Sequence, residues 1–412
     1  MTSFFGWVDF SESEREQMHN VIKLFEQQDT RDELGLGSIR DGFANLLFPG
    51  TSTIQTRIKY MLFIPWLYRE LERQRVLSNE IAGKMRRKEI ELIYALLKSE
   101  DTQGVIGKEA KDKLQRLPSN IYWSGMYAWG IRLFESSQDQ YYRSLDKFYK
   151  KQKDRLVSED KEYTDRSFMY NWHPGLPLCP KKFPQDASFE LSTSEAEYLQ
   201  EQIIRCCSGS LLSFLATDTS PVSTEIHFVW DHPEFERFSE THKKQVLHAR
   251  NFSKIMHGAA LFYNYLLAKK ANIPEWEEDY RNAVQNWVVE MNVMMDIFRQ
   301  WDLDEFWESV KLGNTTVPYS TSTFVGEWID FCIRQGGLSN ILDSSTTAAM
   351  ITDREQYLKR SRARLTNEQA LNNWTGEAGT GQLTYRWQII RGMVNDLLSG
   401  LGKNEVKNIV GS

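Results

Sequence analysis

Arg86-Arg-Lys-Glu-Ile-Glu-Leu-Ile-Tyr-Ala-Leu-Leu97 reads as a long helix, and two shorter helical patterns follow it. The first is Gly107-Lys-Glu-Ala-Lys-Asp-Lys-Leu-Gln-Arg-Leu117, and the second is Pro118-Ser-Asn-Ile-Tyr-Trp-Ser-Gly-Met126. Pro118 ends the middle helix, because proline disfavours helical geometry in the residue before it. Ser119 then suits the N-cap of the last helix. This order of elements predicts a helix-turn-helix module.

Such a module predicts a set of DNA contacts. In the usual docking, the second helix crosses the DNA backbone and the start of the third helix enters the major groove. Arg132, after the third helix, adds a predicted backbone contact. The predicted phosphate ligands are Lys108, Lys111, Lys113 and Arg116, and the residues predicted near base edges are Ser119, Asn120, Tyr122 and Trp123.

The same segment also supports two other interpretations. Tyr122, Trp123, Tyr127 and Trp129 make the third helix unusually aromatic, and aromatic side chains more often fill a core than read bases. Three-helix units of this kind also bind other proteins. DNA contact, partner-protein contact and a purely structural role therefore all stay open.

The charge is unevenly distributed along the chain. The net charge is −6, which argues against a wholly basic nucleic-acid coat. Residues 69–153 nevertheless hold 18 Lys and Arg against 12 Asp and Glu, whereas residues 154–412 hold 26 against 35. A basic region inside an acidic chain is typical of a local DNA-contacting surface, and lysine-solvated helix faces would produce the same count.

Helical periodicity dominates the rest of the chain. Long helical patterns occupy roughly residues 243–270, 276–300 and 383–399, and Ser192-Thr-Ser-Glu195 is a capping box that opens another helix. Alternating strand patterns are short and rare, and Thr224-Glu-Ile-His-Phe-Val-Trp230 is the best of them. We expect a mainly α, multi-helical fold with few short strands and an embedded helix-turn-helix, in plain or winged form.

The length of 412 residues indicates more than one domain. Four prolines fall within eleven residues in Trp172-His-Pro-Gly-Leu-Pro-Leu-Cys-Pro-Lys-Lys-Phe-Pro184, and this density favours an extended connector that packs along a surface. We predict four segments: an N-terminal helical region (1–83), the helix-turn-helix-like module (84–156), the proline-rich connector (157–190) and a C-terminal helical domain (191–412).

A second candidate site joins two predicted helices. Leu47-Phe-Pro-Gly-Thr-Ser-Thr-Ile-Gln-Thr-Arg57 places backbone amides and an arginine near a helix N-terminus, where an anion such as a phosphate can bind. Ordinary helix capping explains the same residues and is the favoured interpretation. Thr53, Gln55 and Arg57 are therefore secondary anion contacts.

The sequence predicts no cofactor, no metal site and no membrane association. The four cysteines form no CxxC motif, so neither a zinc site nor a disulfide framework is expected. The N-terminus lacks the pattern of a signal peptide, and the longest apolar run, Met61–Tyr68, is too short to span a bilayer. We expect a cytoplasmic protein.

Motifs for catalysis are weak. The glycines of Gly376-Glu-Ala-Gly-Thr-Gly-Gln-Leu-Thr384 resemble a phosphate loop, but Gln382 replaces its lysine and no strand precedes it. Glu109 and Lys111 have a nuclease-like spacing on what reads as a helix. The sequence also contains two charged clusters. Asp29-Thr-Arg-Asp-Glu33 is interpreted as a helix cap with a surface ion pair. Lys359, Arg360, Arg362 and Arg364 form a basic group near the C-terminus.

Four blocks together resemble a bacterial family catalogued as domain of unknown function 6361. They are Phe5-Gly-Trp-Val-Asp-Phe-Ser11, Asp29-Thr-Arg-Asp-Glu-Leu-Gly35, Leu46-Leu-Phe-Pro-Gly-Thr-Ser-Thr-Ile-Gln-Thr-Arg57 and Leu117-Pro-Ser-Asn-Ile-Tyr-Trp-Ser-Gly125. The resemblance runs nearly full length and transfers no residue role. It implies an association with helicases and nucleases in anti-phage gene islands.

From the residues and this resemblance we expect a non-catalytic accessory protein of a bacterial defence or DNA-processing system. It would bind double-stranded DNA or form a complex with a partner protein such as a helicase or nuclease. The alternatives are an uncatalogued nuclease or effector enzyme, and an assembly or sensor subunit that contacts no nucleic acid.

Overall fold

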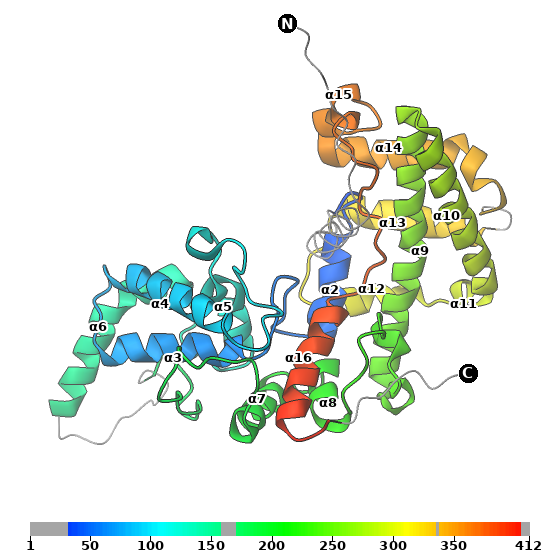
Figure 1. The fold of residues 1–412 in the computed structure, drawn as a ribbon. Coiled ribbons are helices and arrows are strands. Elements are labelled where there is room, and N and C mark those ends of the chain that lie inside the picture. The colour runs from blue at the N-terminus through cyan, green and yellow to red at the C-terminus, as the bar shows by residue number, and fades with distance from the viewer. Residues whose placement is uncertain (1–31, 158–169, 335–337, 405–412) are drawn as a thin grey trace, which may run out of the picture. The chain divides into compact units, whose positions relative to one another are not determined.

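The computed structural model describes residues 32–157, 170–334 and 338–404, and across these ranges the fold is mainly helical, as the sequence predicts (Figure 1). These residues form no strand ladder, and an isolated antiparallel bridge joins Arg132 to Trp172. No helix in the described ranges combines the length and the hydropathy needed to cross a lipid bilayer.

The chain divides into two compact units, each assembled from segments that are far apart in the sequence. Unit 1 contains Met1–Gly42 and His248–Leu383, and unit 2 contains Phe43–Leu247 and Thr384–Ser412. The division passes through α2 (Gly37–Leu47) and α9 (Glu240–Ala271). The boundaries predicted after residues 83, 156 and 190 all fall inside unit 2, and independent folding of the four predicted segments stays a prediction.

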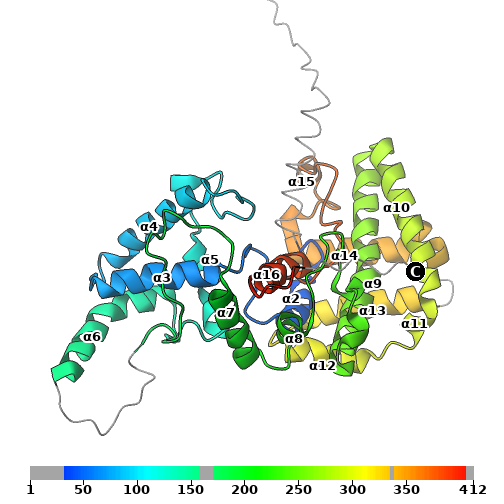
Figure 2. The same ribbon diagram turned by 60° about the horizontal axis from the view of Figure 1, so that its bottom comes forward.

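Unit 2 is built around α3 (Tyr60–Arg73). Every residue from Tyr60 to Tyr68 is buried, because this part of the helix is apolar on all sides and lies inside its neighbours. α4 and α5 pack against it, as both views show (Figures 1 and 2). The other elements of unit 2 are α4 (Ile81–Leu96), η1 (Lys111–Lys113), α5 (Pro118–Ala128), α6 (Gln138–Val157), α7 (Thr193–Cys206), α8 (Leu211–Asp218), η3 (Val229–Asp231), η4 (Phe235–Arg237) and α16 (Trp387–Gly400).

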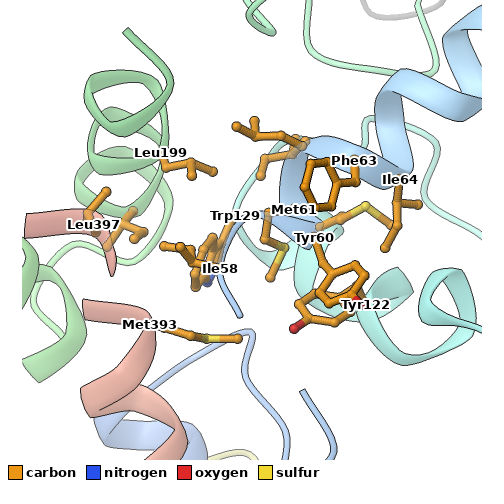
Figure 3. Packing of buried hydrophobic residues seen from close by; sticks show 14 of the residues in the cluster. Ile58, Tyr60, Met61, Phe63, Ile64, Tyr122, Trp129, Leu199, Met393 and Leu397 are labelled. Carbon is orange, nitrogen blue, oxygen red and sulfur yellow. The ribbon is translucent and has the colours of Figure 1, made fainter. Parts of the chain in front are cut away.

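The C-terminal helix α16 completes the core of unit 2. It packs against α7 and α8. Figure 3 shows Leu199 of α7 and Met393 and Leu397 of α16 around Ile58, within one buried apolar cluster. α7 begins at the predicted capping box, where the Glu195 amide donates to Ser192 Oγ and the Ser192 amide donates to the Glu195 carboxylate (2.8 Å).

The described part of the proline-rich segment, residues 170–190, packs along α3 as the sequence predicts. Trp172 stacks on Tyr68 at 5.1 Å between ring centroids, and Phe183 stacks on Phe63 at 5.5 Å. Trp66 Nε1 donates a hydrogen bond to the carbonyl of Pro177 (2.9 Å). These contacts fix the segment without regular backbone pairing.

Two local predictions were wrong. Residues 107–117 form turns and the single 3-10 turn η1 where the sequence predicts a helix, because Gly107 (φ +83°) and Lys111 (φ +45°) leave the helical region. Residues 224–230 form a turn and the start of η3 where a strand or wing was expected. The carbonyl of Ile226 accepts from the Trp387 side chain (2.9 Å), so side chains satisfy this backbone in place of a partner strand.

Unit 1 is a second helical assembly, and in both views α9 and α10 run beside each other (Figures 1 and 2). Together with α16, α9 and α10 confirm the long patterns predicted near residues 243–270, 276–300 and 383–399. Unit 1 contains α9, α10 (Pro274–Val293), α11 (Met295–Arg299), α12 (Leu303–Leu312), α13 (Tyr319–Ile333), η5 (Leu338–Asp343), α14 (Ser345–Lys359), η6 (Arg360–Arg362) and α15 (Glu368–Leu371).

Candidate functional site

The segment predicted as a DNA-crossing helix is a short loop, residues 107–117, that is fastened to α4. We name it the basic loop. Arg86 of α4 donates to the carbonyls of Leu114 (3.0 Å) and Asp112 (2.7 Å). The Tyr94 hydroxyl donates to the Asp112 carboxylate (2.7 Å). Side chains of α4 therefore satisfy the polar groups of the loop that an α-helix would have satisfied internally.

Packing beneath the basic loop fixes its shape. Gly107 has a positive φ, and a Cβ at this position would lie 2.7 Å from Leu114 and 3.0 Å from Ile93. Glycine is thus required both for the backbone conformation and for the close approach. The Ile106 amide donates to the Tyr60 hydroxyl (3.0 Å), which ties the start of the loop to α3.

The four predicted phosphate ligands all lie exposed on the basic loop. Lys108, Lys111, Lys113 and Arg116 point their charges to solvent, and none forms an ion pair with another described residue. Lys108 Nζ has a long hydrogen bond to Thr102 Oγ1 (3.4 Å). Because Asp112 is bonded to Tyr94, its carboxylate is already engaged by a neutral donor.

The residues predicted to read bases lie mostly inside the protein. Ser119 is fully buried and donates from its amide (2.7 Å) and its hydroxyl (3.0 Å) to the carboxylate of Glu89. Tyr122 is also fully buried, and its hydroxyl accepts from the Thr56 amide (2.8 Å) and donates to the carbonyl of Arg57 (2.8 Å). These side chains stabilise the core of unit 2 and do not face solvent.

Trp123 and Arg132 form a buried pair. The Arg132 guanidinium lies 4.4 Å from the centroid of the Trp123 ring and donates to the Trp123 carbonyl (3.1 Å). It also bonds the carbonyls of Phe134 and Ser136. Burial lowers the pKa of Arg132 to about 10. Neither side chain reaches a surface on which a duplex could lie.

Asn120 is exposed, but it serves the local backbone. Its Oδ1 accepts from the Leu117 amide (3.2 Å), and its Nδ2 bonds Gln138. Together with the missing second helix, these placements leave the predicted helix-turn-helix without its recognition surface. What remains of the predicted interface is the set of four cations on the basic loop.

The predicted anion loop is occupied by the protein's own groups. Gln55 is buried, accepts from the Ser52 amide (3.2 Å) and donates to the Gly50 carbonyl (3.3 Å). Arg57 donates two hydrogen bonds to the Asp396 carboxylate (2.8 and 3.0 Å) and also forms an ion pair with Asp101 (2.5 Å). Thr53 is exposed in a turn. The arginine is thus satisfied by carboxylates. The predicted helix capping is not formed either, since α3 begins at Tyr60 and its N-cap residue, Lys59, makes no side-chain capping hydrogen bond.

Unit 1 joins the two charged clusters that the sequence shows separately. Glu33 pairs with Lys359 and Arg364, the latter at 3.0 Å. Glu355, which is fully buried, accepts from the Tyr263 hydroxyl and from the amide of Leu365 (2.9 Å). Burial alone would raise the pKa of Glu355, but these hydrogen bonds and the Lys359 ammonium lower it.

This cluster clamps the chain between residues 32 and 36. Arg354 of α14 donates to the carbonyls of Leu34 (2.9 Å) and Gly35 (3.3 Å), and the Asp32 carboxylate caps α2 through the Gly37 amide (2.6 Å). A pocket of about 40 Å³ adjoins it, lined in part by His257 and Tyr263. This volume suits a water molecule or two. Burial lowers the pKa of His257, which favours the neutral ring.

The two charged halves of this clamp are each visible in the sequence, but their contact is not. More than 300 residues separate Glu33 from Lys359, and no spacing rule connects positions so far apart. Among the described residues, no group of three or more His, Cys, Asp or Glu side chains is placed to hold a metal ion.

Comparisons with known proteins identify a matching family but no reaction. Residues 2–400 match the model of a family described as "Family of unknown function (DUF6361)". A search of curated proteins and a search of solved structures each returned no match.

Proposed function

Since the chain belongs to DUF6361, a family of unknown function, we propose a role from its own surface: it contacts the phosphate backbone of double-stranded DNA through the basic loop. In this proposal the protein is a non-catalytic accessory component of a bacterial DNA-processing or defence system. The contact depends on charge and not on base sequence. Of the four residues predicted to read bases, Ser119, Tyr122 and Trp123 are buried, and exposed Asn120 is hydrogen-bonded within the protein.

The observation that carries the proposal is the arrangement of cations on a fixed loop. Lys108, Lys111, Lys113 and Arg116 fall within nine residues and are all exposed. Arg86 and Tyr94 hold the loop backbone and its Asp112 carboxylate, so the cations are displayed from a defined platform. Exposed cations of this kind neutralise phosphates and release counterions, which makes binding depend steeply on salt.

A mobility-shift assay over a salt series tests the proposal. Lys111→Glu with Lys113→Glu reverses two charges at exposed positions, so we expect the folded double variant to bind duplex DNA at least about tenfold more weakly. The slope of log affinity against log salt should shrink in magnitude by about two, one for each phosphate that the variant no longer neutralises. Circular dichroism checks that the helical content is unchanged.

The matched control is Lys147→Glu with Lys151→Glu, an equal charge change at exposed positions of α6 in the same unit. We expect this control to bind within about twofold of the parent protein. Equal loss in both double variants would show a diffuse charge effect, and undiminished binding by the loop variant would remove the loop from the interface. Magnesium-dependent cleavage of the DNA in the same reactions would favour the enzyme alternative.

A second candidate function, assembly with a partner protein, is favoured by an apolar stripe in unit 1. Val289 and Val293 of α10 and Ile297 of α11 follow one another at helical spacing and are 65%, 83% and 45% exposed. Valine and isoleucine at such exposure on two consecutive helices are typical of protein contact surfaces.

Cross-linking mass spectrometry on the complex purified from the native host tests this assembly role. Cross-links between a partner and α10 or α11 should disappear in the Val289→Asp, Val293→Asp variant. They should persist in Leu178→Asp, which places the same charge at an 89% exposed leucine of unit 2. Cross-links unaffected by the stripe variant would contradict the assignment of this surface.

A further inference from the structure

A second, larger pocket lies in unit 1, at the start of α10. Its volume is about 440 Å³, within the range of small-molecule sites. One wall is the first turns of α10, with Trp276, Asp279 and Tyr280, and the other is the segment Thr375–Glu377. Its lining therefore combines aromatic rings with carboxylates and contains no cationic side chain.

The aromatic rings of this pocket are held in place by ring packing and by a hydrogen bond between its two walls. Trp374 is buried and meets Trp276 edge to face, with 5.1 Å between ring centroids, and also packs against Tyr280 at 6.4 Å. The Tyr280 hydroxyl donates to the carbonyl of Gly376 (2.7 Å). Trp276 and Tyr280 nevertheless stay half-buried, so part of each side chain remains open to solvent.

Gly376 allows the two walls to meet. Its φ is +100°, and a Cβ there would lie 3.0 Å from the Trp276 ring. Any larger residue would strain the backbone and press on the indole. Gly376, one of the glycines that resemble a phosphate loop in the sequence, thus shapes an aromatic pocket.

Two carboxylates at the pocket edge attract a cation, against the positive end of the α10 dipole. Asp279 and Glu377 are exposed at its edge. Burial, and then the negative charges of Glu377 and Asp279, raise the pKa of Tyr280, so both carboxylates act on this ring. Arg281, the nearest basic residue along α10, is paired with Glu277 (2.9 Å) and Glu278 (3.4 Å). Its charge is therefore largely neutralised on the helix itself.

We propose that this pocket binds an organic cation, an alkylammonium or guanidinium group, against the rings of Trp276 and Tyr280. Such a cation is attracted to the face of an indole or phenol, most strongly when it is poorly hydrated, and the two carboxylates complete the charge balance. The group arrives either on a free small molecule or as a methylated lysine or arginine side chain of a protein. The proposal is independent of the basic loop, which belongs to unit 2.

A purely structural role for these rings makes a different prediction. If Trp276 and Trp374 served only to dock the segment after α15 onto α10, the pocket would show no preference for positive charge. Charge preference therefore separates the two explanations, and it is measured by comparing ligands of equal shape.

Isothermal titration calorimetry of the full chain provides the test. The probes are choline and its neutral isostere 3,3-dimethylbutan-1-ol, followed by N-acetylarginine amide and an N-acetyl-trimethyllysine amide. We expect choline to bind at least about fivefold more tightly than the isostere, in line with a cation held by two rings. If the amino-acid amides bind more tightly than choline, the cationic group belongs to a protein side chain. If choline binds more tightly, the cationic group belongs to a free small molecule.

Three variants locate the site. Trp276→Ala should abolish choline binding, and the surface change Asp279→Asn with Glu377→Gln should weaken it about threefold or more while keeping both rings. Asn286→Ala, at an exposed position farther along α10, should leave binding unchanged. Equal affinity for choline and its isostere, no binding of any of the three cations, or full binding by folded Trp276→Ala would each overturn the proposal.

Discussion

Single residues in this protein show how burial changes the chemistry of a carboxylate. Glu89 in α4 and Glu355 in α14 are both fully buried. Glu355 accepts several hydrogen bonds and lies beside Lys359, so it stays charged and its pKa is lowered. Burial raises the pKa of Glu89 to about 8, and within the described part of the chain its hydrogen bonds come from Ser119 alone. The opposite shifts therefore reflect both the deeper position of Glu89 in the protein and its fewer partners.

Glu89 should make the protein less stable as pH rises. Its pKa in the folded state lies above the usual value of about 4.5, so the folded state binds the proton more tightly than the unfolded state does. The contribution is favourable below that usual value and is lost as pH rises through about 8. Glu89→Gln, which stays neutral, should gain roughly 4 kcal/mol over the parent between about pH 5 and pH 9, because about three pH units of this range lie below the folded-state pKa of about 8.

Urea unfolding followed by circular dichroism at both pH values measures this gain. Glu91→Gln on the same helix, at an exposed position, is the control and should follow the parent protein. A Glu89→Gln variant whose free energy of unfolding falls with pH as steeply as the parent's would show that Glu89 is not the titrating group.

At the scale of elements, close helix contacts depend on particular glycines. Gly258 of α9 lies against Trp287 of α10, and a Cβ at this position would approach the indole to 2.2 Å. Trp287 cannot move aside easily, because it is buried and its Nε1 donates to the Lys254 carbonyl (2.8 Å). The α9–α10 contact therefore requires the absence of a side chain at residue 258.

Gly258→Ala should destabilise the protein by about 1–3 kcal/mol, the usual cost of overpacking a core. Gly326→Ala is the matched control, since Gly326 lies within α13 and a Cβ there meets nothing within 4 Å. Alanine is the better helix former, so the control should be neutral or stabilising by up to about 1 kcal/mol. Thermal unfolding measures the change in Tm of each variant relative to the parent protein. Equal changes in Tm would contradict the proposed close contact.

At the scale of the whole molecule, unit 2 is completed by the end of the chain. α16 inserts six buried side chains into the core of this unit, and Asp396 of α16 receives Arg57. Its Trp387 also donates to the carbonyl of Ile226 (2.9 Å). The buried side chains of α16 are Trp387, Ile390, Met393, Val394, Leu397 and Leu398.

Truncation after Leu383 should therefore disrupt a unit whose other residues come from the first part of the chain. We expect α7 and α8, which pack on α16, to lose hydrogen-exchange protection, because burying six large apolar side chains contributes on the order of 10 kcal/mol. Truncation after Asn404 keeps every described residue and serves as the control. Full protection of α7 and α8 in the shorter protein would show that α16 is dispensable.

Periodicity and capping rules predicted those helices whose signal lies within the helix sequence itself. The periodicity near residues 243–270, 276–300 and 383–399 gave the long helices, and Ser192 with Glu195 gave the start of α7. The same rules failed at residues 107–117. There the turn backbone is stabilised by Arg86 and Tyr94 of α4, and no pattern within the loop reports a bond that arrives from elsewhere.

By itself, then, the sequence determined the mainly helical class, the family and the cluster of four cations between residues 108 and 116, because periodicity, motif blocks and charge are properties of short stretches. Tertiary structure alone decided which polar residues are available to a ligand. Ser119 and Tyr122 look like surface readers in the sequence, yet packing of α5 on α3 buries them. Trp276 and Gly376 meet only because the chain returns after 100 residues to the start of α10. Burial and long-range proximity are properties of the folded chain.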